Sequence, residues 1–244
     1  PYFGGVAEDW QAHIAETITA AEAGFHSKHL IAQNIANKGK KIEDPNPRVS
    51  IFNFHYAKPP ATVAENYHLN RVIADDETGF SGADRVKPYR LEGWDFIIAG
   101  GAVYSNLDYS FAVGHEDGSN TINAPGGGGP ELQRQLQILK EFIHRFDFTR
   151  MKPDDSLVKG TVPGDVTVRV LSESARAHAV YINGNGLAEL ALDLPSGRYG
   201  AEWVNTKTGQ IEKAEPFRRD GGIRTLQVPA YTDDIALRIV RLEP

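Results

Sequence analysis

Three consecutive acids follow a short apolar run in residues 71 to 80, RVIADDETGF. Asp75, Asp76 and Glu77 repel one another, so an unconstrained sequence would rarely place them straight after a buried strand. Thr78 and Gly79 come next, and a glycine lets the backbone turn away from the strand end. A carboxylate at such a position is suited to attack an electrophilic carbon. The alternative interpretation is a solvated acidic loop.

Polar strand ends recur through the first 110 residues. Four segments start with apolar residues and finish with Asn, His, Tyr, Asp or Glu: HLIAQN (29–34), SIFNFHY (50–56), VIADDE (72–77) and VYSNLDYS (103–110). A (β/α)8 barrel builds its site from residues at the carboxyl ends of its strands. A doubly wound sheet would also bring polar groups there, but no Gly-rich dinucleotide or phosphate-loop fingerprint follows any of these segments.

Helical patterns separate these strands. Apolar residues recur at three- and four-residue steps, or a terminal Pro or Gly marks a helix end, in four segments: 8–23, 59–71, 88–101 and 130–146. Alternation of helix and apolar strand through residue 150 is typical of parallel βαβ units whose sheet is buried on both faces. The sequence therefore predicts an α/β fold of the TIM-barrel type for this region.

The pattern changes to a period of two after residue 155. Short alternating segments, separated by turn signals such as NGNG and RDGG, predict strands at 166–171, 178–183, 187–194, 199–205, 223–228 and 235–240. Strands spaced about ten residues apart are typical of a small antiparallel β-sandwich. We therefore expect two domains, 1–152 and 153–244.

Composition excludes several classes of function. The net charge is −6 and no Lys/Arg cluster could follow a phosphate backbone, so nucleic acid is not an expected partner. The sequence contains no run of about 18 apolar residues, so a membrane is not an expected partner. Cys is absent, which excludes disulfides and thiolate sites but leaves the compartment open. The tetrapeptide HEDG (115–118) has no spaced metal-ligand partners, so we expect no metal, and no cofactor is expected either. No GxSxG elbow occurs, so a serine nucleophile of that type is not expected.

The order and phrasing of several segments resemble a known family. PYFGGV (1–6), VSIFNFHY (49–56), VIADDETGF (72–80) and EGWDFIIAGGAVYSNLDYSFAVGHEDG (92–118) resemble the second half of a bacterial, clan A glycoside hydrolase barrel of the cellulase-like and apiosidase-like type. LDLPSGRYGAEWVNTKTGQI (192–211) resembles the β-sandwich, called a putative collagen-binding domain, that follows such barrels. No residue here supports the collagen-binding name.

The resemblance implies roles for individual residues. In that clan, a Glu at the end of the seventh strand is the nucleophile of a retaining mechanism, and Glu77 falls at that position. Tyr56 is implied to hold this carboxylate and His55 to bind a sugar hydroxyl. Five further residues complete the expected site. Asn34 is expected to line the cleft, Tyr104 and Tyr109 to contact the substrate by stacking on a sugar ring, and Glu116 to contact substrate and serve as a backup catalytic carboxylate. Strand alternation predicts that Asp75 points inward with Glu77, as a further substrate contact. For each residue alone, a packing role is the competing interpretation.

The same resemblance implies that the second catalytic carboxyl group, the acid/base Glu, lies outside these 244 residues. The clan's acid/base Glu follows an Asn at the end of the fourth strand, which would precede PYFGG in this chain. We therefore expect a C-terminal portion that is inactive alone, with a second chain as a possible source of the other half barrel. The implied function is a secreted or periplasmic bacterial glycosidase with a polysaccharide or oligosaccharide substrate. The alternative is a non-catalytic carbohydrate-binding or scaffold protein with a degenerate barrel.

Overall fold

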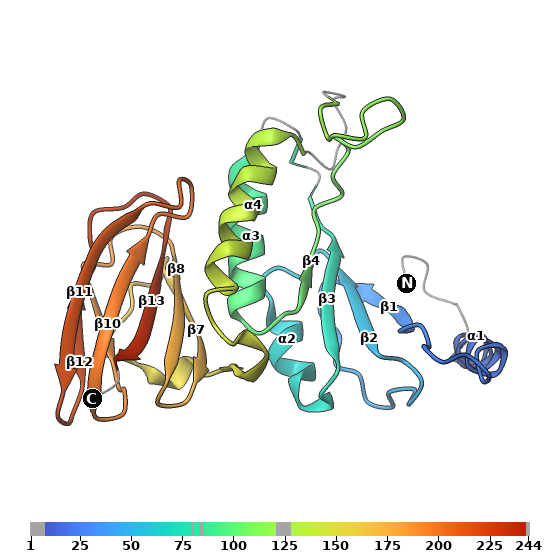
Figure 1. Cartoon of the computed structure of the whole chain (residues 1–244), viewed down its shortest axis with the longest axis horizontal. Helices are drawn as coiled ribbons and strands as arrows, with labels where there is room; N and C mark the ends of the chain where they lie inside the picture. Colours follow the sequence, from blue (N-terminus) through green and yellow to red (C-terminus); the bar gives the residue numbers. More distant parts are fainter. Residues whose placement is uncertain (1–7, 80, 83–84, 121–127, 243–244) are drawn as a thin grey trace.

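Four parallel strands form the first sheet of the computed structural model, which describes residues 8–79, 81–82, 85–120 and 128–242. The sheet has the order β1-β2-β3-β4, with bounds β1 Ala32–Asn37, β2 Ile51–His55, β3 Val72–Glu77 and β4 Val103–Tyr104. Each neighbour pairs in parallel, as Figure 1 shows. The predicted combination of parallel strands and helices is confirmed for this region, although residues 38–50, which connect β1 to β2, contain no helix. PYFGGV (1–6) lies outside the described residues.

Two predicted elements are shorter than the sequence pattern indicated. The expected helix 59–71 is α2 (Ala61–Asn66) followed by the 3-10 turn η1 (Tyr67–Leu69), and it ends where Asn70 adopts a left-handed backbone with φ of 50°. The expected strand 103–110 is reduced to the two residues of β4. The residues after β4 instead form a long loop that extends beyond the end of β3 (Figure 1).

Helix α1 (Glu8–Ala21) lies at the β1 edge of the sheet, away from the other helices (Figure 1). Its apolar positions Trp10 and Ile14 are 58% and 41% exposed. They line a groove of about 380 Å³ that also includes Ile31 and Val49. The predicted helix is thus present, but its apolar face is only partly covered by the described part of the chain.

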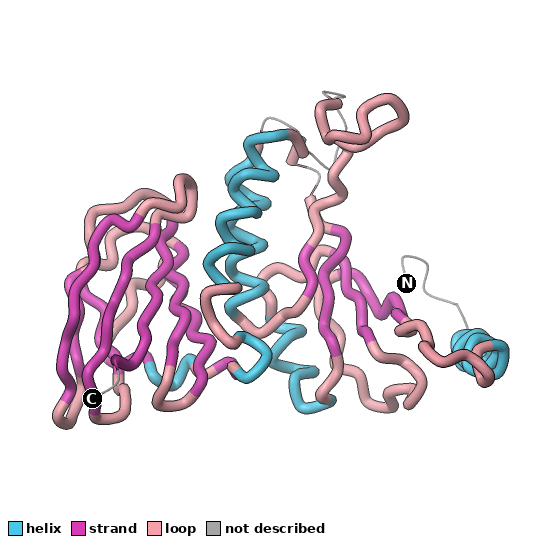
Figure 2. The backbone as a smooth tube through the Cα atoms, viewed as in Figure 1, coloured by secondary structure: helices cyan, strands magenta, loops and turns pink. Residues whose placement is uncertain are grey.

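Helices α3 (Val86–Ile98) and α4 (Pro130–Ile143) form a layer between two sheets, as both Figure 1 and Figure 2 show. On one side, Phe96 packs with Phe52, Phe54 and Ile73 of the parallel sheet. On the other side, Trp94 is fully buried and stacks on Tyr181 of the next sheet at 5.6 Å between ring centroids. A helix that is buried on two opposite faces needs apolar residues around most of its circumference, and α3 has them.

The C-terminal half is a sandwich of two antiparallel sheets. The larger sheet has the order β11-β10-β13-β8-β7-β5 and the smaller one β12-β9-β6. Their bounds are β5 Lys152–Pro153, β6 Val158–Lys159, β7 Thr167–Glu173, β8 Ala177–Asn183, β9 Glu189–Leu192, β10 Gly197–Val204, β11 Ile211–Arg219, β12 Arg224–Gln227 and β13 Asp234–Leu242. Trp203 and Tyr199 are fully buried between the sheets, so they pack the core.

Three strands of the sandwich were not predicted: the two-residue strands β5 and β6, and the nine-residue strand β11. β11 carries mostly charged residues and Pro216, and only Phe217 is buried. It lies at the edge of the larger sheet, where one side needs no ladder hydrogen bonds and proline is tolerated. An edge strand with little apolar burial lacks the alternating pattern that revealed the other strands.

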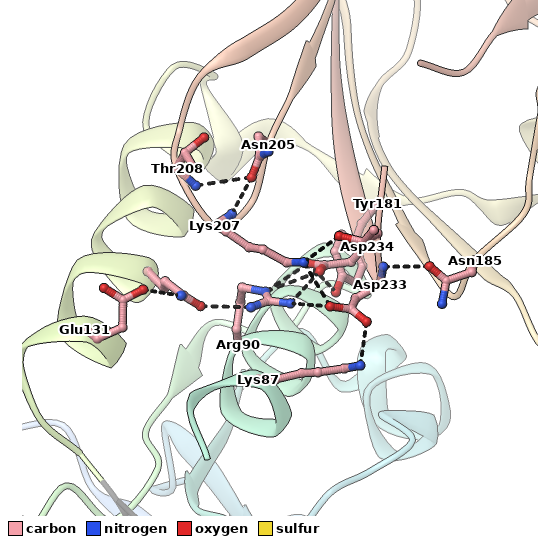
Figure 3. Close-up of polar contacts among 12 residues, drawn as sticks. Lys87, Arg90, Glu131, Tyr181, Asn185, Asn205, Lys207, Thr208, Asp233 and Asp234 are labelled. Carbon is pink, nitrogen blue, oxygen red and sulfur yellow. Dashed lines mark hydrogen bonds and ion pairs between the residues drawn. The ribbon is translucent and has the colours of Figure 1, made fainter. Parts of the chain in front are cut away.

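A buried ion pair joins the helix layer to the sandwich (Figure 3). The Arg90 guanidinium of α3 lies 2.7 Å from the Asp234 carboxylate of β13, and the two side chains are 3% and 0% exposed. Tyr181 donates to the same carboxylate at 3.2 Å, and Arg90 donates to Gln135 of α4 at 2.9 Å. The donors of Arg90 and Tyr181 meet acceptors on other elements, so the cluster holds the two layers relative to each other.

None of the helices among the described residues is long and apolar enough to cross a membrane.

Replacing Arg90 by Ala should lower the free energy of unfolding by about 3 to 5 kcal/mol, because Asp234 would remain buried without its guanidinium partner. The measurement is urea denaturation followed by circular dichroism. Arg134→Ala is the control, since the Arg134–Glu131 pair is about half exposed on both sides and should contribute less than about 1 kcal/mol. Equal losses in the two variants would contradict the central role of the Arg90–Asp234 pair.

Candidate active site

An irregularity in the pairing of β2 and β3 shapes the end of β3. Phe54 is the partner of Asp75, but the next residue, His55, is the partner of Glu77. Asp76 is therefore an extra residue on β3, which is the arrangement of a β-bulge. A bulge interrupts the alternation of side chains, so Asp75 and Glu77, on either side of it, point to opposite faces of the sheet.

The bulge brings two acids to one imidazole. The His55 Nδ1 atom lies 3.3 Å from a Glu77 carboxylate oxygen, and its Nε2 atom lies 3.4 Å from an Asp76 oxygen. Asp76 is about half exposed, whereas Glu77 is 27% exposed. When protonated, the ring can donate to both carboxylates and offset their mutual repulsion.

Tyr56 holds the Glu77 carboxylate from the neighbouring strand end. Its hydroxyl donates to a Glu77 oxygen at 2.5 Å, and its backbone N–H donates to the Glu77 carbonyl at 2.7 Å. The backbone of Tyr56 is left-handed, with φ of 55°. Such a conformation is unfavourable for a bulky residue and persists only where surrounding contacts fix it. The expected meeting of Tyr56, His55 and Glu77 is therefore present in the geometry.

The chain turns sharply after Glu77. The Thr78 hydroxyl donates to the Glu92 carboxylate of α3 at 2.6 Å. Gly79 has φ of 133°, and a Cβ atom at this position would lie 2.6 Å from the Tyr89 ring. No side chain fits there, so the glycine is required both for the backbone conformation and for the close approach of Tyr89. This agrees with the turn expected from the Thr-Gly sequence.

Asp75 faces the opposite way from the expected one. Its register partner Phe54 belongs to the apolar cluster beneath α2 and α3, so Asp75 also lies on the helix side of the sheet. It is 2% exposed, and its Oδ2 atom accepts the Ala57 N–H at 3.1 Å. Burial raises the pKa of this carboxyl to about 7, with the Glu92 charge adding to the effect and the Ala57 bond opposing it. The expected inward orientation beside Glu77 is wrong, because the bulge falls between the two residues.

Tyr104 also lies on the helix side. Its hydroxyl donates to the Tyr89 carbonyl at 2.9 Å, and its ring is next to Gly93 of α3. Burial raises the pKa of this phenol well above its usual value. The ring is packed against a helix and is not available as a platform for a sugar, which corrects the expected orientation. Tyr109, the second stacking candidate, is 43% exposed in the loop after β4.

Asn34 lies on the same face as the Glu77 cluster. It is the register partner of Asn53, and its side-chain oxygen accepts the Asn53 amide at 2.8 Å. Asn53 and His55 are two residues apart on β2 and so point to the same side of the sheet. This face, opposite to α2 and α3, therefore carries a row of polar groups: Asn34, Asn53, His55 and Glu77. The expected position of Asn34 fits this row.

Glu116 lies in the exposed loop after β4. Its carboxylate accepts the N–H of Gly114 at 3.0 Å, and this bond lowers its pKa. A group kept ionised in this way is poorly suited to donate a proton. His115 and Asp117 likewise bond to Ser119 of the same loop. The polar groups of the HEDG segment thus stabilise their own turn, which weakens Glu116 as a backup catalytic carboxylate.

Two residues near the site were not singled out from the sequence. Asn53 is buried beside Asn34, and its signal was a polar residue inside an otherwise apolar strand. Glu92 lies on α3, where its carboxylate accepts a hydrogen bond from the Thr78 hydroxyl and forms an ion pair with Lys58. A charged residue on a helix gives no local sign that it faces a sheet, so only the packing of α3 reveals Glu92.

The raised pKa of Asp75 predicts a specific pH dependence of stability. Between pH 4 and pH 7 the folded state holds a proton on Asp75 that the unfolded state releases, so the free energy of unfolding falls as the pH rises. Asp75→Asn removes this contribution. The free energy of unfolding of this variant minus that of the unmodified chain should therefore increase by up to about 4 kcal/mol as the pH rises from 4 to 8.

Urea denaturation of both proteins across this pH range provides the measurement. Other buried groups, such as His178 with its pKa lowered to about 4 by burial, contribute equally to both proteins and cancel in the difference. A difference that stays constant with pH would contradict the assignment of this proton to Asp75.

Comparison with known proteins places this geometry in a structural context. No protein-family model and no curated protein matches the sequence. Solved structures do match the fold. One described as a glycoside hydrolase has a TM-score of 0.67 at 15% identity, covering 96% of this chain and 61% of its own. A glycoside hydrolase of family 5 from Bacteroides vulgatus ATCC 8482 has a TM-score of 0.64 at 15% identity, covering 95% and 59%.

A third structure belongs to a xylanase of glycoside hydrolase family 30, subfamily 8, from Clostridium acetobutylicum. Its TM-score is 0.55 at 10% identity, covering 96% of this chain and 59% of the xylanase. This chain therefore spans about three fifths of the length of the structures it matches. The likeness shows a glycosidase-like fold that is related to the TIM barrel, although the described residues contribute four parallel strands and not a closed barrel.

Proposed function

We propose that this chain is part of a retaining glycoside hydrolase in which Glu77 is the nucleophile. The observation that carries the proposal is the Glu77 carboxylate at the carboxyl end of a parallel strand, held by the Tyr56 hydroxyl at 2.5 Å and adjacent to His55. The glycosidase-like fold supports it, since enzymes of the barrel type build their sites at these strand ends.

The geometry suits the two steps of a retaining mechanism. Glu77 would attack the anomeric carbon and form a covalent glycosyl-enzyme ester, and water would then hydrolyse that ester. The Tyr56 bond fixes the carboxylate in one rotamer before attack and stabilises the carboxylate that leaves in the second step. His55 contacts Glu77 on the same face and, in this proposal, would bind a hydroxyl group of the sugar.

A retaining mechanism also needs a second carboxyl group about 5 to 5.5 Å from the first, to protonate the leaving oxygen. Asp75 lies behind the sheet and Glu116 bonds within its own loop, so neither is suited to this role. We assign the proton donor to further strands that complete the barrel beside β1 and β4. They would come from a longer form of this protein or from a second chain.

The proposed substrate is a polysaccharide or oligosaccharide, and the proposed location is secreted or periplasmic in a bacterium. Support for the substrate class comes from the fold and from the row of polar side chains on the face that carries Glu77. Amide, imidazole and carboxylate groups together supply the donors and acceptors that sugar hydroxyls require.

Glu77→Gln in the protein with its complete barrel should lower glycosidase turnover on the order of 10³-fold or more, equivalent to about 4 kcal/mol of transition-state stabilisation. A more direct measurement is mass spectrometry after incubation with a panel of activated 2-deoxy-2-fluoroglycosides. Their good leaving groups need little proton donation, so the covalent ester accumulates. The peptide that contains Glu77 should gain the mass of the fluorosugar.

Asp76→Asn is the matched control, because Asp76 is adjacent on the same strand and contacts the same imidazole. It should still form the adduct on Glu77, whereas Glu77→Gln should not. An adduct on another carboxylate would sink the assignment of Glu77. Oligosaccharide binding without adduct or turnover would instead support a carbohydrate-binding protein with a degenerate barrel.

A further inference from the structure

We propose that Asp75 is a positioning residue that acts through Tyr56 on Glu77. Its carboxylate holds the chain segment after β2, and this segment presents the Tyr56 hydroxyl to the Glu77 carboxylate. The inference rests on the proposed function of Glu77 and adds to it a support on the helix side of the sheet. It also replaces the substrate contact that the sequence suggested for Asp75.

The path from Asp75 to Glu77 runs through three consecutive contacts. Asp75 Oδ2 accepts the Ala57 N–H at 3.1 Å, and Ala57 directly follows Tyr56 in the chain. The backbone N–H of Tyr56 donates to the Glu77 carbonyl, and the Tyr56 side chain donates to the Glu77 carboxylate. Fixing the peptide group between Tyr56 and Ala57 therefore fixes both contacts of Tyr56 with Glu77.

The turn at Tyr56 needs such a support. Tyr56 has a left-handed backbone, which a bulky residue adopts only where its surroundings hold it. Ala57 is buried, so its N–H requires an acceptor within the protein. The Asp75 carboxylate supplies that acceptor from the helix side of the sheet. Without this acceptor, the Tyr56–Ala57 peptide group would rotate toward a more favourable backbone conformation. The Tyr56 ring would then move away from the Glu77 carboxylate.

A second acid supports the same region from α3. Glu92 receives the Thr78 hydroxyl at 2.6 Å and pairs with Lys58. Thr78 follows Glu77, and Lys58 follows the Tyr56–Ala57 pair. The chain is therefore tied to the helix side two residues after Tyr56, through Lys58, and directly after Glu77, through Thr78. The Asp75 contact is the link closest to Tyr56 in this arrangement.

The Asp75 site is unfavourable for a carboxylate, which argues for a specific role. Asp75 lines a cavity of about 190 Å³ together with Lys58, Glu92 and Asp95, and its Oδ1 atom has no hydrogen-bond partner within the described residues. Burial and the nearby acids raise its pKa. A residue that only filled this space would be better apolar. An acceptor for the Ala57 N–H explains why a polar residue is present.

The test observes Tyr56 directly by NMR of protein labelled with ¹³Cζ-tyrosine. The chain has nine tyrosines, and Tyr56→Phe identifies the Tyr56 resonance. Glu77→Gln should move this resonance upfield, because the phenol no longer donates to a carboxylate. Asp75→Ala should move it in the same direction, whereas Asp75→Asn should leave it in place, since the amide oxygen can still accept the Ala57 N–H.

The double variant Asp75→Ala/Glu77→Gln separates positioning from a general structural effect. If Asp75 acts through the Tyr56–Glu77 contact, the resonance should move no farther than in Glu77→Gln alone. Asp155→Ala is the matched control, because the Asp155 carboxylate accepts the Val170 N–H at 2.7 Å in the sandwich. It should leave the Tyr56 resonance unchanged.

An unchanged Tyr56 resonance in folded Asp75→Ala would overturn the proposal, as would an additive movement in the double variant. If Asp75→Ala does not fold, Asp75→Glu serves as the second variant. It keeps the charge and displaces the acceptor by one methylene group, so it should move the Tyr56 resonance, and no movement would overturn the proposal. The readout needs no turnover, so it is independent of whether Glu77 forms the covalent adduct.

Discussion

The buried pair of Arg90 and Asp234 fixes the position of helix α3, and most of the structure depends on that helix. Arg90 ties α3 to β13 of the sandwich, Trp94 of the same helix packs against Tyr181, and Phe96 packs against the parallel sheet. An isolated buried charge would be strongly unfavourable, so the pair permits one arrangement of the layers.

Helix α3 also connects this scaffold to the candidate site. Glu92 projects from α3 toward the turn after β3 and accepts the Thr78 hydroxyl. The polar side of the site, with Tyr56 and Glu77, lies across the sheet from these supports. The sandwich is thus linked to the site through one helix, although its own strands are part of a separate core. The contacts of Arg90 with Asp234 and of Glu92 with Thr78 therefore connect the sandwich to the turn after β3 through one helix.

Asp75 illustrates how a site can be maintained at the expense of stability. A carboxyl group that is buried with a raised pKa lowers the free energy of unfolding at neutral pH, and an apolar residue would pack there more favourably. The left-handed backbone of Tyr56 is a second unfavourable feature within the same few residues. Strain and unfavourable burial that coincide next to a held carboxylate are typical of sites whose geometry matters more than their local stability.

The sequence by itself determined the combination of helices and parallel strands, the change to antiparallel strands after residue 155, and the strand-end positions of His55, Tyr56 and Glu77. These follow from hydrophobic period and chain order, which are local properties. The tertiary structure alone decided which acids share a face. Strict alternation places Asp75 beside Glu77, but the extra residue Asp76 reverses this, because a bulge depends on the register with β2. The side-chain positions of Tyr104 and Glu92 also depend on the tertiary structure, because only the packing of α3 against the sheet shows where they lie.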